Sequence, residues 1–139
     1  MFERFSYQAR LAVANARNLT RGELSQEICP RHFLWALLIY GTELPQHISA
    51  ISIGDVLQQL GRAPERDGDP SVLLPLSKSS KLLLERSYDI AVTDAREMVD
   101  EWDLLIAAMW ETEGPVWTAL QHMIEIHVNV PAATDRPLL

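Results

Sequence analysis

The residues best suited to chemistry in this chain are Cys29 and His32, which are three positions apart. A thiol and an imidazole can form a cysteine nucleophile and its base, or half of a zinc site. Cys29 is the only cysteine of the chain, so no disulfide forms within it. No second ligand pair accompanies these two residues, whereas a structural zinc ion takes four ligands. We therefore expect no metal site.

Catalysis by Cys29 is the alternative that these residues leave open. Pro30 predicts that Cys29 lies at the start of a helix, where the helix dipole favours a thiolate. Nucleophilic catalysis also needs a general base and oxyanion donors, and the sequence identifies neither. An inert, partly buried thiol is the favoured interpretation. We expect a protein that is not an enzyme and binds no cofactor, with a Cys29-based enzyme as the alternative.

A group of four acidic residues is the other candidate for chemistry, since paired carboxylates can act as general acid and base. The group consists of Glu97, Asp100, Glu101 and Asp103. Asp100 is expected to cap a helix, and Asp103 completes an aspartate version of the capping box. We expect these carboxylates to be solvated and to complement the positive end of that helix.

The elements that position these residues are predicted to occur twice, because the sequence resembles itself at a shift of 71 residues. Phe5-Ser6 corresponds to Leu76-Ser77 at this shift. Three apolar positions follow without an insertion: Ile28, Leu34 and Ala36 fall on Val99, Leu105 and Ala107. Such a repeat predicts two copies of one helical module packed against each other.

Apolar residues at helical spacing predict an all-α fold. The expected helices span residues 6–18, 30–41, 45–51, 52–60, 77–94, 100–113 and 114–123, and an eighth at 124–130 is short or absent because of its β-branched residues and Pro131. We expect a single domain over residues 1–139. Its first repeat covers residues 1–61, the linker 62–75, the second repeat 76–130 and a frayed tail 131–139.

Composition excludes several classes of function. The net charge of −7, from 19 acidic and 12 basic side chains, disfavours binding to nucleic acid. The apolar run at residues 33–42 is about half the roughly 20 residues that a membrane span needs. The first residues lack the pattern of a secretory signal. These features predict a cytoplasmic protein without a membrane anchor.

Two stretches of the sequence form recognisable motifs: Phe2-Glu3-Arg4-Phe5-Ser6 with Ala9-Arg10, and Ile28, His32 and Leu34 followed by Ala36-Leu37-Leu38. Both stretches resemble the Clp N-terminal repeat, the domain that precedes the ATPase rings of Clp/Hsp100 unfoldases. The resemblance covers about residues 1–125. It implies a pseudo-two-fold duplication of a four-helix repeat, with about seven to eight helices in all.

The resemblance also implies a function in protein docking. Members of the family bind adaptors and substrates of an ATP-dependent unfoldase and its protease. The sequence contains no phosphate-binding loop, so no nucleotide is expected in this chain. In some members each repeat binds phosphoarginine through a hydroxyl at the start of the first helix and a glutamate at the start of the second. Ser6 and Ser77 occupy the hydroxyl positions, but Arg31 and Trp102 replace the glutamates, so we expect no phosphoarginine binding.

The surface expected to bind protein partners lies at the starts of the helices in both repeats. It is formed by Ser6, Arg31, His32, Ser77, Glu101 and Trp102. Trp102 is the expected anchor, because an exposed tryptophan in the first turn of a helix suits an interface. The alternative to an adaptor-binding or substrate-binding module is a small structural subunit that stabilises a Clp-type ring or a homodimer.

Overall fold

Six α-helices and one short 3-10 helix form the part of the chain that the computed structural model describes, residues 2–46, 48–65 and 68–127. No strand occurs in these residues, so the all-α prediction is confirmed. The helices are α1 (Tyr7–Glu23), α2 (Pro30–Tyr40), η1 (Leu44–Gln46), α3 (Ala50–Leu60), α4 (Lys78–Thr93), α5 (Glu101–Trp110) and α6 (Gly114–His127). None of the described helices is long and apolar enough to cross a membrane.

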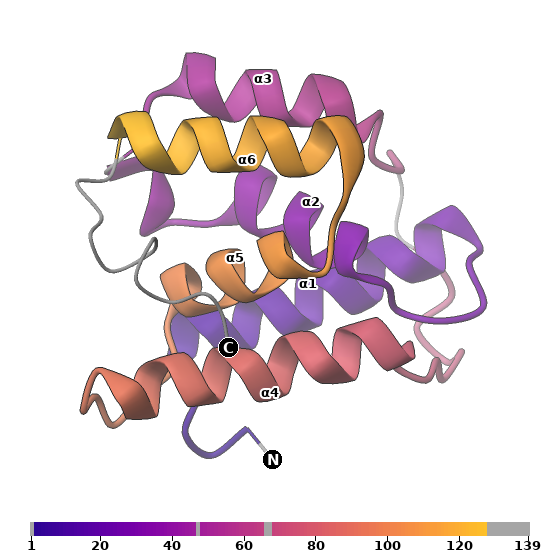
Figure 1. Ribbon diagram of the computed structural model, residues 1–139. Helices are drawn as coiled ribbons and strands as arrows, with labels where there is room; N and C mark the ends of the chain where they lie inside the picture. Colours follow the sequence, from indigo (N-terminus) through magenta and orange to yellow (C-terminus); the bar gives the residue numbers. More distant parts are fainter. Residues whose placement is uncertain (1, 47, 66–67, 128–139) are drawn as a thin grey trace.

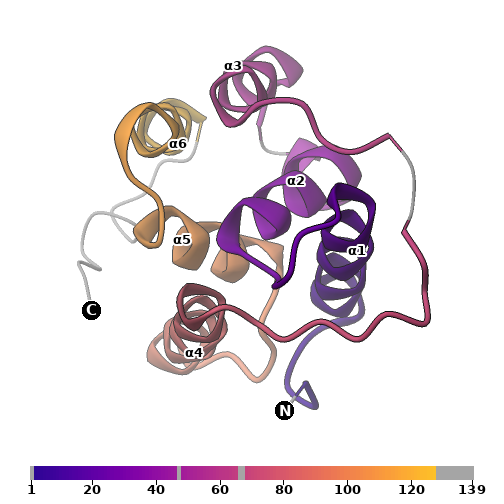
Figure 2. The same cartoon turned by 90° about the vertical axis from the view of Figure 1, so that its right-hand side faces the viewer.

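The helices form three tiers, each with one helix from each half of the chain. Helices α2 and α5 lie in the middle tier, α1 and α4 lie on one side of it, and α3 and α6 lie together on the other (Figures 1 and 2). Helix α1 packs on α2 as α4 packs on α5. The predicted duplication is therefore confirmed, with α1–α3 corresponding to α4–α6.

The segments that precede the helices pair between the halves. Phe5 forms a parallel bridge with Val99, and Ile28 forms the equivalent bridge with Leu76. The Val99 N–H donates to the carbonyl of Arg4 at 2.7 Å, and the Ile28 N–H makes the corresponding bond at 2.9 Å. Both partners of the first bridge move onto those of the second at a shift of 71 residues. Each half therefore supplies the backbone partner that the other half needs.

Helices α2 and α5 form the centre of the apolar core, because nearly every residue between their first and last turns is buried. Each large apolar side chain buried in this way contributes roughly 1.5–3 kcal/mol to stability. Trp35 is buried on α2, and its indole N–H donates to the carbonyl of Gly61 at 3.1 Å. This bond fixes the end of α3 to the central tier.

Several predicted helix ends differ from the observed ones. Helix α1 continues beyond residue 18 to Glu23, and two predicted short helices are replaced by η1 and a single α3. The cap of α3 is Ser49, whose hydroxyl accepts the N–H of Ser52 at 3.2 Å. Helix α6 continues past residue 123 because Ile124 is buried, which outweighs its lower helix propensity. The remainder of the predicted eighth helix and the tail, residues 128–139, lie outside the described residues.

Helices α1 and α4 end in the same unusual way. Leu24 has φ 63° and Ala95, its equivalent in the second half, has φ 58°. This left-handed conformation ends a helix most easily at glycine, because a Cβ is disfavoured there. Leu24 is also 79% exposed. Packing of the Leu24 side chain therefore contributes little stability to offset the strain of its backbone.

Candidate partner-binding surface

The predicted site residues fall on two faces, and each face combines the two halves of the chain. The N–H of Ser6, at the start of α1, donates to the carbonyl of Val99, which precedes the cap residue of α5. The N–H of Ser77, at the start of α4, donates to Ile28, which precedes α2. We call the first surface the Ser6 face (Ser6, Glu101 and Trp102) and the second the Ser77 face (Ser77, Arg31 and His32).

The hydroxyl groups of both serines are used as helix caps. Ser6 Oγ accepts the N–H of Ala9 at 3.1 Å, and Ser77 Oγ accepts the N–H of Ser80 at 3.0 Å. Such caps contribute about 1 kcal/mol each. Ser6 is half-buried, whereas Ser77 is only 6% exposed. The Ser77 face therefore offers a partner no free hydroxyl at this position.

A carboxylate from α1 organises the Ser77 face. Glu23 Oε1 accepts from Arg31 Nη2 at 2.6 Å and from His32 Nε2 at 2.8 Å, and Ser25 donates to the same oxygen. His32 Nδ1 in turn accepts the N–H of Cys29 at 2.8 Å. Because Nδ1 is the acceptor, the neutral ring carries its proton on Nε2. His32 is fully buried and thus links α1 to the start of α2.

The electrostatics of this group follow from its burial and its hydrogen bonds. Burial alone would raise the pKa of Glu23, but the bonds from Arg31, Ser25 and His32 lower it to about 2. Burial lowers the pKa of His32, and its bond to Glu23 offsets this only in part. Near neutral pH the group therefore holds an ionised Glu23, a charged Arg31 and a neutral His32.

The equivalent position in the second half carries a group with an arginine, Arg96, at its centre in place of a carboxylate. Arg96 binds Asp103 through two bonds of 2.5 and 2.8 Å, and it also donates to Asp100 and Asp94 at 3.1 Å. The predicted capping box is confirmed, because Asp100 and Asp103 each accept the backbone N–H of the other. Asp103 is buried, so the prediction that it is solvated was wrong. Burial raises the pKa of Asp103, and the bidentate bonds from Arg96 offset this in part.

Glu101 is also buried, at 1% exposure, so the prediction that it is solvated was wrong. Its carboxylate instead holds two segments of the chain together through hydrogen bonds, and we call this set of bonds the Glu101 tie. Its two carboxylate oxygens accept the N–H groups of Thr42, Glu43 and Leu44 at 3.0, 3.1 and 3.2 Å. These amides lead from the end of α2 into η1, so Glu101 binds the loop after α2 to the start of α5. Its equivalent in the first half is Pro30, which has no carboxylate to make such bonds.

Trp102 and Arg31 are the accessible predicted residues that occupy equivalent positions on the two faces. Trp102 is half-buried and packs with part of its ring against the apolar core. The side chain of Arg31 is 43% exposed. Both project from the first turn of a helix that the ionic groups described above hold in place.

Sequence reasoning missed the two residues that organise these faces, Glu23 and Arg96. One signal was available, since Glu23 and Asp94 are acidic at the repeat distance. The half-exposed Cys29 thiol lies 3.6 Å from the carbonyl of Glu27. Within the described ranges, no group of three or more His, Cys, Asp or Glu side chains could hold a metal ion.

Comparison with solved structures identifies the fold. The N-terminal domain of the caseinolytic protease associated chaperone ClpD from Arabidopsis thaliana is 15% identical, with a TM-score of 0.62 over 88% of this chain and 86% of that chain. The Hsp104 N-terminal domain from Candida albicans is 17% identical, with a TM-score of 0.63 over 88% and 81%. The fold is that of a Clp N-terminal domain. The fold implied by the sequence resemblance is thus confirmed.

A third similar structure is described as a peptide from the EAEC T6SS Sci1 SciI protein. It is 20% identical, with a TM-score of 0.59 over 86% of this chain and 82% of that chain. No protein-family model and no curated protein matches the sequence. At these identities the likeness concerns the fold, and the function must be argued from the surface.

Proposed function

We propose that this domain is a protein-interaction module that binds adaptors or substrates of a Clp-type ATP-dependent unfoldase or protease, without catalysis of its own. The observation that carries the proposal is the pair of equivalent, firmly held helix starts that present Arg31 and Trp102. The fold supports it, because a similar domain belongs to a caseinolytic protease associated chaperone.

On the Ser6 face, Trp102 is the proposed anchor. A tryptophan contributes most to an interface when it is already ordered, because less side-chain entropy is lost on binding. The Arg96 group and the Glu101 tie hold the first turn of α5 from both sides. Trp102 is therefore presented to a partner on a rigid base.

On the Ser77 face, Arg31 is the proposed contact. Its guanidinium donates to Glu23 and to Ser25, yet its exposed fraction leaves donors available to a carboxylate or carbonyl of a partner. A phosphoarginine guanidinium would meet Arg31 on this face and Trp102 on the other. Neither is a carboxylate, so phosphoarginine binding is not proposed.

The other predicted site residues act from behind the surface. His32, Ser77 and Glu101 are buried, and each makes a hydrogen bond that positions a helix start. The proposed contact residues are therefore Ser6, Arg31 and Trp102.

The experiment that tests the proposal compares protein capture by the wild-type domain, Trp102→Ala and Arg31→Ala. The matched control is Tyr40→Ala, which removes a 54% exposed aromatic side chain at the opposite end of α2. Circular dichroism and thermal unfolding confirm that each variant folds. We expect Trp102→Ala to lose at least tenfold in affinity for a captured partner, as for an interface anchor.

Equal capture by the wild type and by both face variants would reject these faces as the binding site. A wild-type chain whose light scattering shows concentration-dependent association would instead support the homodimer alternative.

A further inference from the structure

Helix α1 has a basic outer face in an acidic protein. Its inner face is formed by small and apolar residues such as Ala9, Val13 and Ala16, which are buried. The residues on the opposite side follow one another at alternating intervals of three and four positions, so they form a straight row along the helix. We call this row the α1 stripe: Tyr7, Arg10, Ala14 and Arg17. Arg17 is half-buried and the other members are exposed, with Tyr7 at 68%.

The two arginines of the α1 stripe have no ionic partner in the described part of the chain. Four other arginines there form ion pairs: Arg31, Arg62, Arg86 and Arg96. Arg10 and Arg17 form none, although acidic side chains outnumber basic ones by 19 to 12 in the whole chain. The acidic residue of α1 is Glu23, and its carboxylate already binds Arg31 and His32. Two positive charges on the stripe therefore remain available to a partner.

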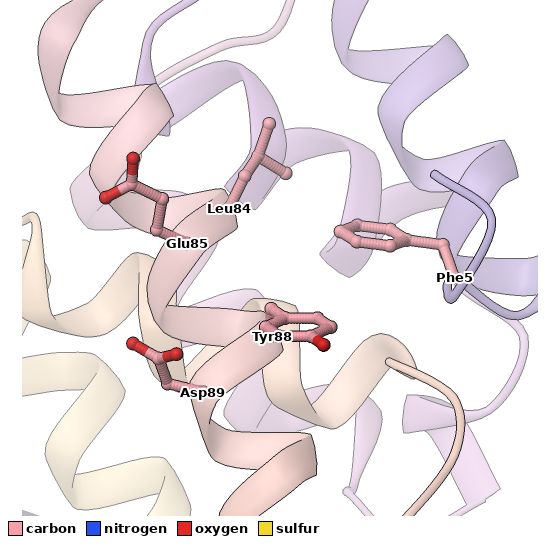
Figure 3. Close-up of a pocket in the computed structure, with 5 residues that line it drawn as sticks. All are labelled: Phe5, Leu84, Glu85, Tyr88 and Asp89. Atoms are coloured by element: carbon pink, nitrogen blue, oxygen red, sulfur yellow. The ribbon is translucent and has the colours of Figure 1, made fainter. Parts of the chain in front are cut away.

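The basic character belongs to α1 and is not shared by α4, its equivalent in the second half. At the repeat distance, Ala14 and Arg17 correspond to Glu85 and Tyr88. Figure 3 shows the carboxylates of Glu85 and Asp89 projecting from α4. The α1 stripe contains no acid and no lysine. Acids and lysine are depleted at the centre of protein interfaces, whereas tyrosine and arginine are enriched there, so the composition of the stripe is that of an interface.

The spacing of the stripe suits a second helix. Side chains in such a row can meet a helix packed alongside over several turns, as in a coiled coil. Ala14 has the smallest side chain of the row and lies between Arg10 and Arg17, so a partner helix can approach closely at this point. The two arginines are about 10 Å apart along the axis, at a rise of 1.5 Å per residue. Carboxylates seven residues apart on a helix that lies along α1 match this distance.

The charge of the whole protein argues against nucleic acid as the occupant of the stripe. The net charge of −7 repels a long run of phosphates, even where one helix is basic. A short acidic helix needs only local complementarity, and it can also use the apolar contacts of Tyr7 and Ala14.

We propose that the α1 stripe binds an acidic helix of a partner protein. Carboxylates seven residues apart on that helix accept hydrogen bonds from the guanidinium groups of Arg10 and Arg17. An apolar residue between these carboxylates packs on Ala14 and against the ring of Tyr7. The stripe includes none of the contact residues of the Ser6 face or the Ser77 face, so this site goes beyond the proposed function.

The test is a titration of the full 139-residue chain, followed by amide NMR shifts, with a capped peptide in which Glu-Ala-Gln-Leu-Ala-Gln-Ala is repeated three times. We expect saturable shifts of the Ala14 and Arg17 amides. The variant Arg10→Gln/Arg17→Gln should bind this peptide about tenfold more weakly, because two ion pairs are lost. The same peptide with glutamine in place of each glutamate should bind the wild type more weakly by about the same factor.

A matched control is Lys78→Gln/Lys81→Gln, which removes the same charge from exposed positions on α4. Unchanged affinity in the α1 variant would overturn the inference, and so would an equal loss in the α4 control, which would indicate only long-range attraction. Saturable shifts of the same amides with a double-stranded DNA but not with the peptide would overturn it as well. Trp102→Ala should bind the peptide like the wild type, so loss of peptide binding and loss of partner capture are separable results.

Discussion

The Glu101 tie leads to the sharpest prediction for the folded state. Glu101→Gln keeps the size of the side chain but replaces one accepting oxygen by an NH₂ group. Because both carboxylate oxygens accept backbone N–H groups, either orientation of the amide places a donor against a donor. The substitution should therefore break at least one bond and leave an amide of the residue 42–44 loop unpaired.

The expected size of this effect follows from the burial of the three amides. A hydrogen bond to a charged acceptor contributes about 1.5–3 kcal/mol. Thr42 is exposed and Glu43 is half-buried, so water can replace part of their loss, whereas Leu44 is fully buried. We expect the free energy of unfolding to fall by about 3 kcal/mol, less than the sum of three such bonds.

Urea unfolding measures this change, with a constant m-value as the sign that the native state is otherwise preserved. Glu113→Gln is the control, because it makes the same substitution at an exposed position. Hydrogen exchange should show that the Leu44 amide loses protection in Glu101→Gln. A loss of stability below about 0.5 kcal/mol, the usual range for surface substitutions, would refute the assigned role of Glu101.

Three further predictions concern single groups. Leu24→Gly should raise the free energy of unfolding by about 1 kcal/mol, because glycine relieves the left-handed strain at an exposed position, and a lower melting temperature would contradict this. Glu23 has a pKa of about 2 when folded, against 4.5 as its ordinary value, so its contribution is present above pH 4.5 and is lost as the pH falls toward 2. The pKa of His32 is likewise lowered from its ordinary value of 6.5, so the stability that the neutral imidazole contributes is lost as the pH falls below 6.5. The urea midpoint should therefore fall on acidification. In Glu23→Gln the part of this decrease below pH 4.5 should be smaller. Arg96→Lys should cost about 1–2 kcal/mol, because lysine keeps the charge but cannot bind Asp103 through a planar fork, and an unchanged urea midpoint would show that the fork is dispensable.

The features that the sequence predicted well depend on residues close together in the chain. The caps at Ser6, Ser77 and Asp100 each involve a backbone N–H three residues ahead, and such local patterns are visible in a sequence. The repeat distance of 71 residues was visible as well, because apolar positions recur along it. Local capping and periodicity were therefore enough to predict the fold class.

The features that the sequence could not predict depend on distant partners. Glu101 looked like an ordinary solvated acid of a first helical turn, since the amides that it binds are 57 to 59 residues away. The ends of α3 and α6 were misplaced because burial of residues such as Ile124 outweighs local propensity. The backbone hydrogen bonds that hold Ser6 next to the start of α5 and Ser77 next to the start of α2 likewise depend on the pairing between the halves.

This crossed pairing has a consequence for how the domain is put together. A polypeptide with only one repeat would leave both of its entry segments, at Phe5 and at Ile28, without backbone partners. Two such polypeptides could supply each other's missing backbone hydrogen-bond partners by pairing symmetrically. The present chain thus has the layout of a two-fold dimer whose subunits have been fused head to tail, so neither half is expected to be stable when it is cut away from the other.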